Sequence, residues 1–369
     1  MMIQVKKVTL HLIEQNLLAP FVTSTGKVDT RESILVEAED VDGVVGWGEV
    51  VAFSSPWYTE ETIKTCWHVL EDFLVPRMLT QEYEHPEQLQ NDFQIVKRNK
   101  MAKASIDMAI WDLYSKKQGI SLSEAIGGTR NFIDSGVVVS IDSIDRMLRK
   151  IEEHVESGYK RIKIKIKPGQ DYELLAQIRH KFPTLPLMVD ANSAYTLQDT
   201  KKLKALDEFH LMMIEQPLAE DDIFDHAALQ KELTTPVCLD ESITSSEDAR
   251  KAVEMGSCKV INIKIGRVGG ITEAIRIHDI CRSHQIPVWC GGMLETGISR
   301  AHNIALASLP NFTIPGDISA SSRYWSRDVI NPKVFVENGR IAVPDGPGIG
   351  FEVDREWIQK ITKQKKVIY

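Results

Sequence analysis

Hydrophobic and polar residues alternate strictly in one stretch near the middle of the chain. Residues 161–169 read RIKIKIKPG, with three isoleucines in one phase and Lys163, Lys165 and Lys167 in the other. This alternation predicts a β-strand that is closed by the Pro-Gly pair. Two interpretations are open at this point. The lysines face water on a half-buried strand, or they face a protein interior, where an ammonium group is costly.

Short apolar runs that end in a polar residue or glycine recur about every 25 residues through the middle of the chain. Stretches with apolar residues at helical spacing separate them, and Ser245 or Ser246 is a candidate N-cap for one of these helices. A repeated strand and helix predicts parallel strands with helical crossovers. Eight successive units favour a closed β/α barrel over the alternative, an open doubly wound sheet. The runs end at Ser140, Lys165, Asp190, Glu215, Asp240, Lys264, Gly291 and Asp317.

The segments on either side of the barrel follow other patterns. Residues 1–128 predict an α+β domain, with a strand meander turning at Asp42-Gly43 and helices over 59–79 and 101–119. The barrel takes residues 129–320. Residues 321–369 contain a predicted hairpin over 334–350 and are too short to fold alone, so we expect them to pack back on the first domain.

Composition limits the class of protein. The chain is 43% hydrophobic and 26% charged, which is typical of a soluble globular protein. Its net charge of −8 argues against nucleic-acid and anionic-membrane partners. The five cysteines show no zinc or disulfide spacing, and no apolar run approaches the roughly 18 residues of a membrane span. We therefore expect a cytoplasmic protein.

Charged residues stand at the ends of five consecutive predicted strands, and barrel enzymes hold their chemistry at that end. A single Asp after a strand is commonly only a helix N-cap. Three carboxylates on adjacent strands, however, converge and require a cation or protons. Asp190, Glu215 and Asp240 offer oxygen ligands alone, which favours Mg²⁺ or Mn²⁺ over Zn²⁺.

The same geometry favours the interior-facing interpretation of the lysines. Lys165 and Lys264 would flank the metal from opposite sides of the barrel. Lowering a lysine pKa from about 10.4 to about 7–8, by desolvation and the field of the metal, costs roughly 3–4 kcal/mol and yields a usable base. Lys163 adds cationic repulsion in the same direction. A base beside a divalent metal suggests removal of a proton α to a carboxylate.

At these residues the chain resembles the enolase superfamily over almost its whole length. The K-x-K of Lys163 and Lys165, the three carboxylates and Lys264 are similar to the muconate-cycloisomerase subgroup. WCGGMLETG lacks the histidine base of mandelate-racemase-like members, and Asp317-Ile318-Ser319 lacks the D-x-D of dipeptide epimerases. As a set, VDANSAYT, EQPL, CLDESI, IKIGRVGG and GGMLETGISRAHN resemble the o-succinylbenzoate synthase/N-acylamino acid racemase branch.

The resemblance implies an α/β fold, a (β/α)7β TIM-like barrel with an N-terminal α+β capping domain. It implies a lyase of menaquinone biosynthesis that dehydrates a succinyl-bearing cyclohexadiene carboxylate, with Lys165 as base and then acid and Lys264 as a cation. The alternative is an N-succinyl- or N-acylamino acid racemase that uses both lysines, and one site can perform both reactions. A non-enzymatic scaffold is disfavoured because all five charged strand ends are present.

The resemblance also implies further site residues. It assigns Asn192 and Glu241 to support of the metal ligands. Two cap loops, residues 18–27 and 51–58, are either plain turns or a lid over the substrate, and with the resemblance Phe21 and Phe53 become apolar contacts of the substrate. The residues implied to line the acyl side of the pocket are Ser140, Gly291, Gly292 and Met293.

Arg267 follows Lys264 by three residues and has two interpretations. It is a solvated cation in a turn, or a fixed guanidinium that lowers the pKa of Lys264 and so supplies the neutral amine a base requires. The expected partner is a small-molecule carboxylate with a succinyl arm. Because such barrels often associate, a homo-oligomer is a fold-level expectation.

Overall fold

The structure is a computed structural model that describes residues 2–22 and 27–369. Its largest sheet is parallel, with seven strands in the order β11-β10-β9-β8-β7-β6-β5 among the described residues. The predicted alternation of strands and helices is confirmed. The strands are β5 (Gly136–Val139), β6 (Arg161–Lys165), β7 (Leu187–Asp190), β8 (Ile214–Glu215), β9 (Val237–Leu239), β10 (Val260–Ile263) and β11 (Val288–Cys290).

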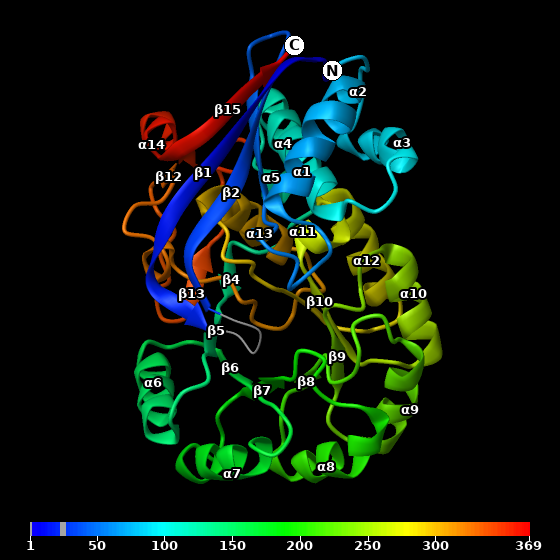
Figure 1. The fold of residues 1–369 in the computed structure, drawn as a ribbon, viewed down its shortest axis with the longest axis vertical. Helices are drawn as coiled ribbons and strands as arrows, with labels where there is room; N and C mark the ends of the chain where they lie inside the picture. Colours follow the sequence, from blue (N-terminus) through cyan, green and yellow to red (C-terminus); the bar gives the residue numbers. More distant parts are fainter. Residues whose placement is uncertain (1, 23–26) are drawn as a thin grey trace.

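Helices alternate with these strands and lie on the outside of the curved sheet (Figure 1). The Ser245 hydroxyl accepts a hydrogen bond from the Asp248 N–H, so the predicted N-cap is confirmed. The helices are α6 (Ile144–Glu156), α7 (Asp171–Lys181), α8 (Thr200–Ala205), α9 (Phe224–Glu232), α10 (Ser246–Met255), α11 (Ile265–Val268), α12 (Ile271–Ser283) and α13 (Gly297–Ala307).

The eighth predicted strand is not a continuous ladder in the structure. Residues 311–317 form isolated parallel bridges, Phe312 to Val288 on one side and Gly316 to Ser135 on the other. Pro315 interrupts the ladder because it lacks an N–H donor. The segment nevertheless spans the gap between β11 and β5, so the architecture is the expected TIM-like α/β barrel.

The cap contains an antiparallel sheet in the order β15-β1-β2-β3, with β15 drawn beside β1 in Figure 1. Helix α4 ends at Gly119, whose φ of +71° suits glycine, as the sequence predicts. The cap elements are β1 (Val5–Val22), β2 (Lys27–Asp40), β3 (Val45–Val50), α1 (Ile63–Val69), α2 (Val75–Met78), α3 (Leu89–Asp92), α4 (Lys100–Gln118) and α5 (Leu122–Ala125). A π-helical turn, Leu70–Leu74, joins α1 to α2.

The C-terminal segment, residues 321–369, pairs both with a strand at the start of the barrel and with a strand of the cap. The predicted hairpin over 334–350 is largely wrong, because only the single bridge from Glu337 to Arg340 pairs within it. Strand β13 (Arg340–Ala342) pairs instead with β4 (Phe132–Asp134). Strand β12 (Ile330–Asn331) pairs with β14 (Glu352–Val353), and helix α14 (Arg355–Ile361) leads into β15 (Thr362–Ile368), which pairs with β1.

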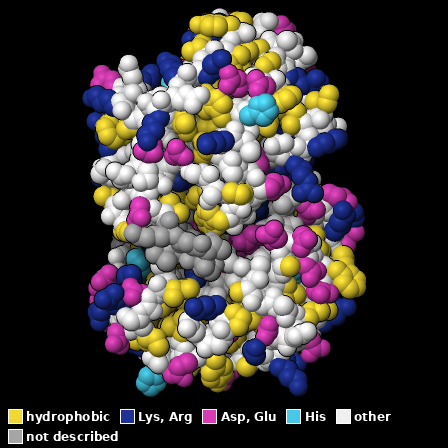
Figure 2. Space-filling view, in the orientation of Figure 1, with side chains coloured by type: hydrophobic (Ala, Val, Ile, Leu, Met, Phe, Trp, Pro, Cys, Tyr) yellow, Lys and Arg dark blue, Asp and Glu magenta, His cyan; other side chains and the backbone are white. Residues whose placement is uncertain are grey.

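The hydrophobic cores of cap and barrel meet at the mouth of the barrel. The cap cluster extends to Met293 and Leu294, which follow β11, and the Trp111 indole of α4 donates to the Thr272 hydroxyl of α12 at 2.9 Å. Acidic and basic side chains are interspersed over the face shown in Figure 2. In the part of the chain that the structure describes, no helix combines the length and apolarity that crossing a bilayer requires.

Two glycines allow α4 to lie directly on β3. A Cβ at Gly48 would stand 1.9 Å from the Ser105 carbonyl oxygen, and one at Gly46 would stand 2.0 Å from that of Ala109. We expect Gly48→Ala to lower the free energy of unfolding by about 3 kcal/mol in urea denaturation, because backbone must shift. Gly346→Ala is the matched control, since among the described atoms the nearest to its Cβ would be the Gly350 Cα, at 3.5 Å. Equal effects of the two substitutions would contradict this account.

Candidate active site

The parallel register gathers the charged strand ends. Lys165 on β6 pairs with Asp190 on β7, which pairs in turn with Glu215 on β8. Asp240 follows β9, and Lys264 follows β10. The five residues predicted to converge therefore stand side by side at the carboxyl ends of five adjacent strands.

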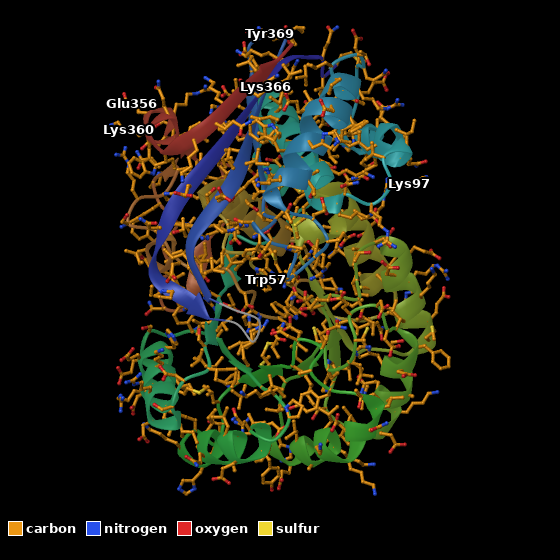
Figure 3. All side chains as sticks on the ribbon, in the orientation of Figure 1. Trp57, Lys97, Glu356, Lys360, Lys366 and Tyr369 are labelled. Atoms are coloured by element: carbon orange, nitrogen blue, oxygen red, sulfur yellow. The ribbon has the colours of Figure 1, made fainter. Side chains whose placement is uncertain are left out.

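A cavity of about 270 Å³ lies between these strand ends and the cap. Its floor includes Lys165, Asp190 and Lys264, and its cap side includes Trp57 and Tyr58. Trp57 is labelled in Figure 3 at the junction of cap and barrel. Both halves of the chain are thus required to enclose the cavity.

The lysines of β6 face the interior of the barrel. Lys163 is 3% exposed, and its Nζ lies 2.8 Å from Asp190 Oδ2 and 2.6 Å from Glu215 Oε2. Lys165 Nζ donates to Asp190 Oδ2 at 2.6 Å. Only Lys167, beyond the strand end, is exposed. The interpretation of a surface strand with its lysines in water is therefore wrong.

The three carboxyl groups differ in their electrostatic surroundings. Burial acts to raise the pKa of Asp190, but Lys163 and Lys165 outweigh it and hold this pKa well below its usual range. Burial and the charge of Asp190 raise the pKa of Glu215 to about 8. Glu215 Oε2 is buried and forms an ion pair with Lys163, but it accepts no hydrogen bond from any residue that the structure describes. Glu215 is thus a carboxyl group that lacks full compensation of its charge.

Side-chain cations neutralise these carboxylates. Lys264 Nζ donates to Asp240 Oδ2 at 2.7 Å, and the Arg267 guanidinium also contacts Asp240. Among residues 2–22 and 27–369, no three Asp, Glu, His or Cys side chains are arranged to hold a metal ion as they stand. The carboxylates meet lysine and arginine groups rather than one common point.

The pKa of Lys264 differs from the prediction. Burial acts to lower it, but attraction to the carboxylate of Asp240 is stronger, and the net direction is upward. Burial and Arg267 act in the predicted direction, but without the charge of a metal ion they do not lower this pKa below its usual value. Arg267 is 2% exposed and donates to the backbone oxygens of Ile243 and Asn262, which excludes the solvated-cation alternative.

The residues implied to support the ligands form one chain of contacts. The Asn192 N–H donates to Asp190 Oδ1 at 2.9 Å, and its side-chain oxygen accepts from Lys165 at 2.6 Å. Its amide nitrogen lies 3.2 Å from Glu241 Oε1. Burial, and then the charge of Asp240, raises the pKa of Glu241 to about 7.

The implied pocket residues take different positions. Phe53, Gly292 and Met293 line the cavity. Ser140 and Gly291 are not among its lining residues, whereas Val138 is. A Cβ at Gly291 would stand 2.7 Å from Lys264 Cε, so this glycine leaves room for the lysine side chain. The side chain of Phe21 lies outside what the structure describes.

Three contacts of the site were missed by the sequence reasoning. Asn262 donates to Glu215 Oε1 at 2.9 Å and to Asp240 Oδ1 at 3.0 Å. It lies two residues before Lys264, so strand alternation could have placed it on the same face. Buried Arg161 donates to Asp317 Oδ1 at 2.5 Å. Arg161 has the same phase as Lys163 and Asp317 ends the eighth run, so strand alternation could have indicated this pair as well.

Tyr58 is the third of these contacts and comes from the cap. Its hydroxyl oxygen accepts from Lys264 Nζ at 2.8 Å and from Arg267 Nη1 at 3.1 Å. Burial, and then the charge of Asp240, raises its pKa to about 12, so the hydroxyl stays protonated at neutral pH. The 51–58 loop was predicted to approach the site. The pattern of hydrophobic and polar residues does not, however, indicate which residue of the loop contacts Lys264.

Comparison with known proteins gives consistent matches. Residues 7–127 match the family "Mandelate racemase / muconate lactonizing enzyme, N-terminal domain", and residues 146–357 match "Enolase C-terminal domain-like". The chain is 57% identical to an o-succinylbenzoate synthase from Bacillus subtilis, over 98% of each chain. It is 44% identical to an N-succinylamino acid racemase from Thermus thermophilus, over 97% of each.

A solved structure extends this likeness to three dimensions. The crystal structure of an enolase superfamily member from Listeria innocua matches with a TM-score of 0.97 at 41% identity, covering 99% of each chain. The family matches together cover most of the chain, and the relatives match it over nearly its full length. The chain therefore belongs to the mandelate racemase/muconate lactonizing enzyme family of the enolase superfamily.

Proposed function

We propose that this chain is an o-succinylbenzoate synthase. It would remove water from 2-succinyl-6-hydroxy-2,4-cyclohexadiene-1-carboxylate and so make o-succinylbenzoate for menaquinone biosynthesis. The observation that carries the proposal is the pair Lys165 and Lys264 in one cavity with three strand-end carboxylates. Several full-length relatives named o-succinylbenzoate synthase support it.

Enzymes of the enolase superfamily use a divalent metal ion. We propose Mg²⁺, replaceable by Mn²⁺, with Asp190, Glu215 and Asp240 as its ligands. The donor set is oxygen alone, and the buried Glu215 Oε2, which has an ion pair with Lys163 but no hydrogen bond among the described residues, is a group that a hard cation would satisfy. When bound, the ion would supply positive charge against the negative charge that develops on the substrate carboxylate. Because Asp240 would then be shared, the attraction that raises the pKa of Lys264 would weaken.

Lys165 would carry out the proton transfers. As a neutral amine it takes the proton α to the substrate carboxylate, and the resulting ammonium gives a proton to the departing hydroxyl, which leaves as water. Lys264 would stay cationic and face the electron-rich intermediate. Lys163 makes ion pairs with Asp190, Glu215 and Asp317, which keep it charged, so it would hold the carboxylates in place.

The direct test is turnover by the purified chain. With Mg²⁺ present, the chain should convert the cyclohexadiene carboxylate to o-succinylbenzoate. The loss of diene absorbance measures this conversion. Absence of turnover would refute the synthase proposal.

A second activity follows from the position of the two lysines. Lys165 and Lys264 stand on non-adjacent strands and both line the cavity, so they could serve opposite faces of one α-carbon. We therefore propose N-succinylamino acid racemase as an additional activity, which the named Thermus relative supports. Comparison of kcat/KM on both substrates would decide which activity dominates.

Arg267 should separate the two activities. Racemisation needs Lys264 as a base in one direction, whereas the synthase needs it only as a cation, and Arg267 acts to lower the pKa of Lys264. We expect Arg267→Gln to reduce racemase kcat/KM by about one to two orders of magnitude more than synthase kcat/KM, roughly 1.4 kcal/mol for each order. Using the ratio of the two activities cancels any loss of folded protein.

The matched control is Arg276→Gln on α12, which removes an arginine whose side chain is half exposed and pairs with Glu273. It should leave the activity ratio unchanged. An equal fall of both activities in Arg267→Gln, or no change in either, would mean that Arg267 does not tune a second base.

Three further assignments belong to the proposal. We place a capping domain at residues 1–128, the catalytic barrel at 129–320, and a C-terminal segment at 321–369. Phe53, Gly292 and Met293 line the cavity and are proposed to contact the substrate. The proposed contacts of Phe21, Ser140 and Gly291 rest on the resemblance alone. A homo-oligomer remains a proposal from the fold.

A further inference from the structure

We propose that the hydroxyl of Tyr58 is a positioning group for Lys264, so that the cap directs the second lysine toward the substrate. This inference rests on the proposed role of Lys264 in proton transfer. Tyr58 lines the cavity on the cap side, and its hydroxyl is the one cap group bonded to Lys264 in the part of the chain that the structure describes.

The loop that carries Tyr58 is closed and anchored at its base. A bridge from Phe53 to Thr62 joins its two ends, and the Ile63 N–H donates to the Phe53 oxygen at 3.0 Å. The buried guanidinium of Arg31 donates to the Val51 and Ala52 oxygens at 2.6 and 2.5 Å. It also lies over the Phe53 ring, 4.4 Å from the centroid. The base of the loop is therefore fixed from the cap side.

Aromatic packing then sets the direction of the Tyr58 ring. The Phe53 and Trp57 rings lie 4.5 Å apart, and the Trp57 and Tyr58 rings lie 5.9 Å apart, edge to face. Lys264 Nζ stands 4.6 Å from the Tyr58 ring centroid. These three rings hold the phenol in one orientation, so that its oxygen meets the ammonium group.

Lys264 thus has two anchors that belong to different parts of the fold. Asp240 attracts its Nζ toward the strand ends, whereas the Tyr58 oxygen, at 2.8 Å, holds it beneath the cap. Arg267, on the barrel side, donates a hydrogen bond to the same Tyr58 oxygen and so fixes the phenol. Without the hydroxyl, Asp240 would be the remaining hydrogen-bond partner of Lys264 among the described contacts, and the amine would be less well directed toward the α-carbon. Small misplacement of a reacting group lowers its rate strongly.

The test uses Tyr58→Phe, which keeps the ring and its aromatic contacts and removes only the oxygen. Tyr114→Phe in the cap is the matched control, since Tyr114 packs on His85 and Trp111 away from the cavity. Each protein is incubated in D₂O with each enantiomer of an N-succinylamino acid, and deuterium at the α-carbon is followed. Lys264→Ala identifies the enantiomer whose proton Lys264 removes.

We expect Tyr58→Phe to slow exchange of that enantiomer about 10-fold or more, with exchange of the other unchanged. Tyr114→Phe should alter neither. Equal slowing of both enantiomers, or of neither, would overturn the positioning role while leaving the proposed function intact. Exchange of both enantiomers that survives Lys264→Ala would instead overturn the proposed role of Lys264, and the positioning role with it.

A double-mutant cycle on synthase kcat/KM gives the second measurement and decides the matter if the wild-type protein exchanges neither enantiomer. If Tyr58 acts through Lys264, Tyr58→Phe costs activity in the wild-type background and costs none in the Lys264→Ala background. The same fold-loss in both backgrounds would mean that Tyr58 acts on the substrate or the cap directly, and would reject the inference.

Discussion

Alanine in place of Lys165 or of Lys264 will lower synthase turnover about 10³-fold or more, because each change removes an acid, base or cation of the reaction. The protein will stay folded. Asp190 keeps its ion pair with Lys163 in the first variant, and Asp240 keeps Arg267 in the second. Steady-state kinetics together with circular dichroism measure both expectations.

Lys167→Ala is the matched control, because Lys167 follows the same alternation but is exposed beyond the strand. It should retain full activity. The two active-site variants should also differ in which enantiomer of an N-succinylamino acid still exchanges its α-proton with D₂O. Identical residual exchange from both enantiomers would contradict the arrangement of one lysine on each face.

Removal of divalent metal by a chelator will abolish turnover, and added Mg²⁺ or Mn²⁺ will restore it. The expected reason is that three buried carboxylates need a cation of higher charge than lysine to bind a substrate carboxylate beside them. Full turnover in metal-free buffer would refute the assignment of Asp190, Glu215 and Asp240.

A second readout of metal binding does not depend on activity. Mg²⁺ should raise the midpoint of thermal unfolding of the wild-type protein, because a ligand that binds only the folded state stabilises it by mass action. Glu215→Gln should remove most of this shift. Glu356 of α14, which is exposed and does not line the cavity, provides the control, and Glu356→Gln should leave the Mg²⁺-dependent shift intact.

The barrel could be predicted because its strands are short, apolar and regularly spaced. Each predicted run from Ser140 to Gly291 has a parallel strand at or just before it. The eighth run fails as a regular strand because Pro315 removes a ladder donor, which periodicity does not register. The predicted C-terminal hairpin fails because β13 finds its partner in β4, about two hundred residues earlier.

The sequence could predict only those site residues whose positions follow from the alternation and register of the barrel strands. Lys165, Asp190 and Glu215 share one level of the sheet, so their convergence follows from register alone. The contact of Tyr58 with Lys264 depends on how a cap loop folds over the barrel, and no local pattern encodes that. The direction of the Lys264 pKa depends on the sum of opposing charges at short range, which spacing does not provide.

The pairing of β15 with β1 bears on how the chain folds during synthesis. Val8 pairs with Ile368, so an edge of the cap sheet is completed only after the whole barrel has been translated. Until then β1 presents an unpaired edge, which is prone to wrong pairing with other chains. Because the 51–58 loop leads out of β3 of this sheet, the enzyme should become active late, when its two ends have met.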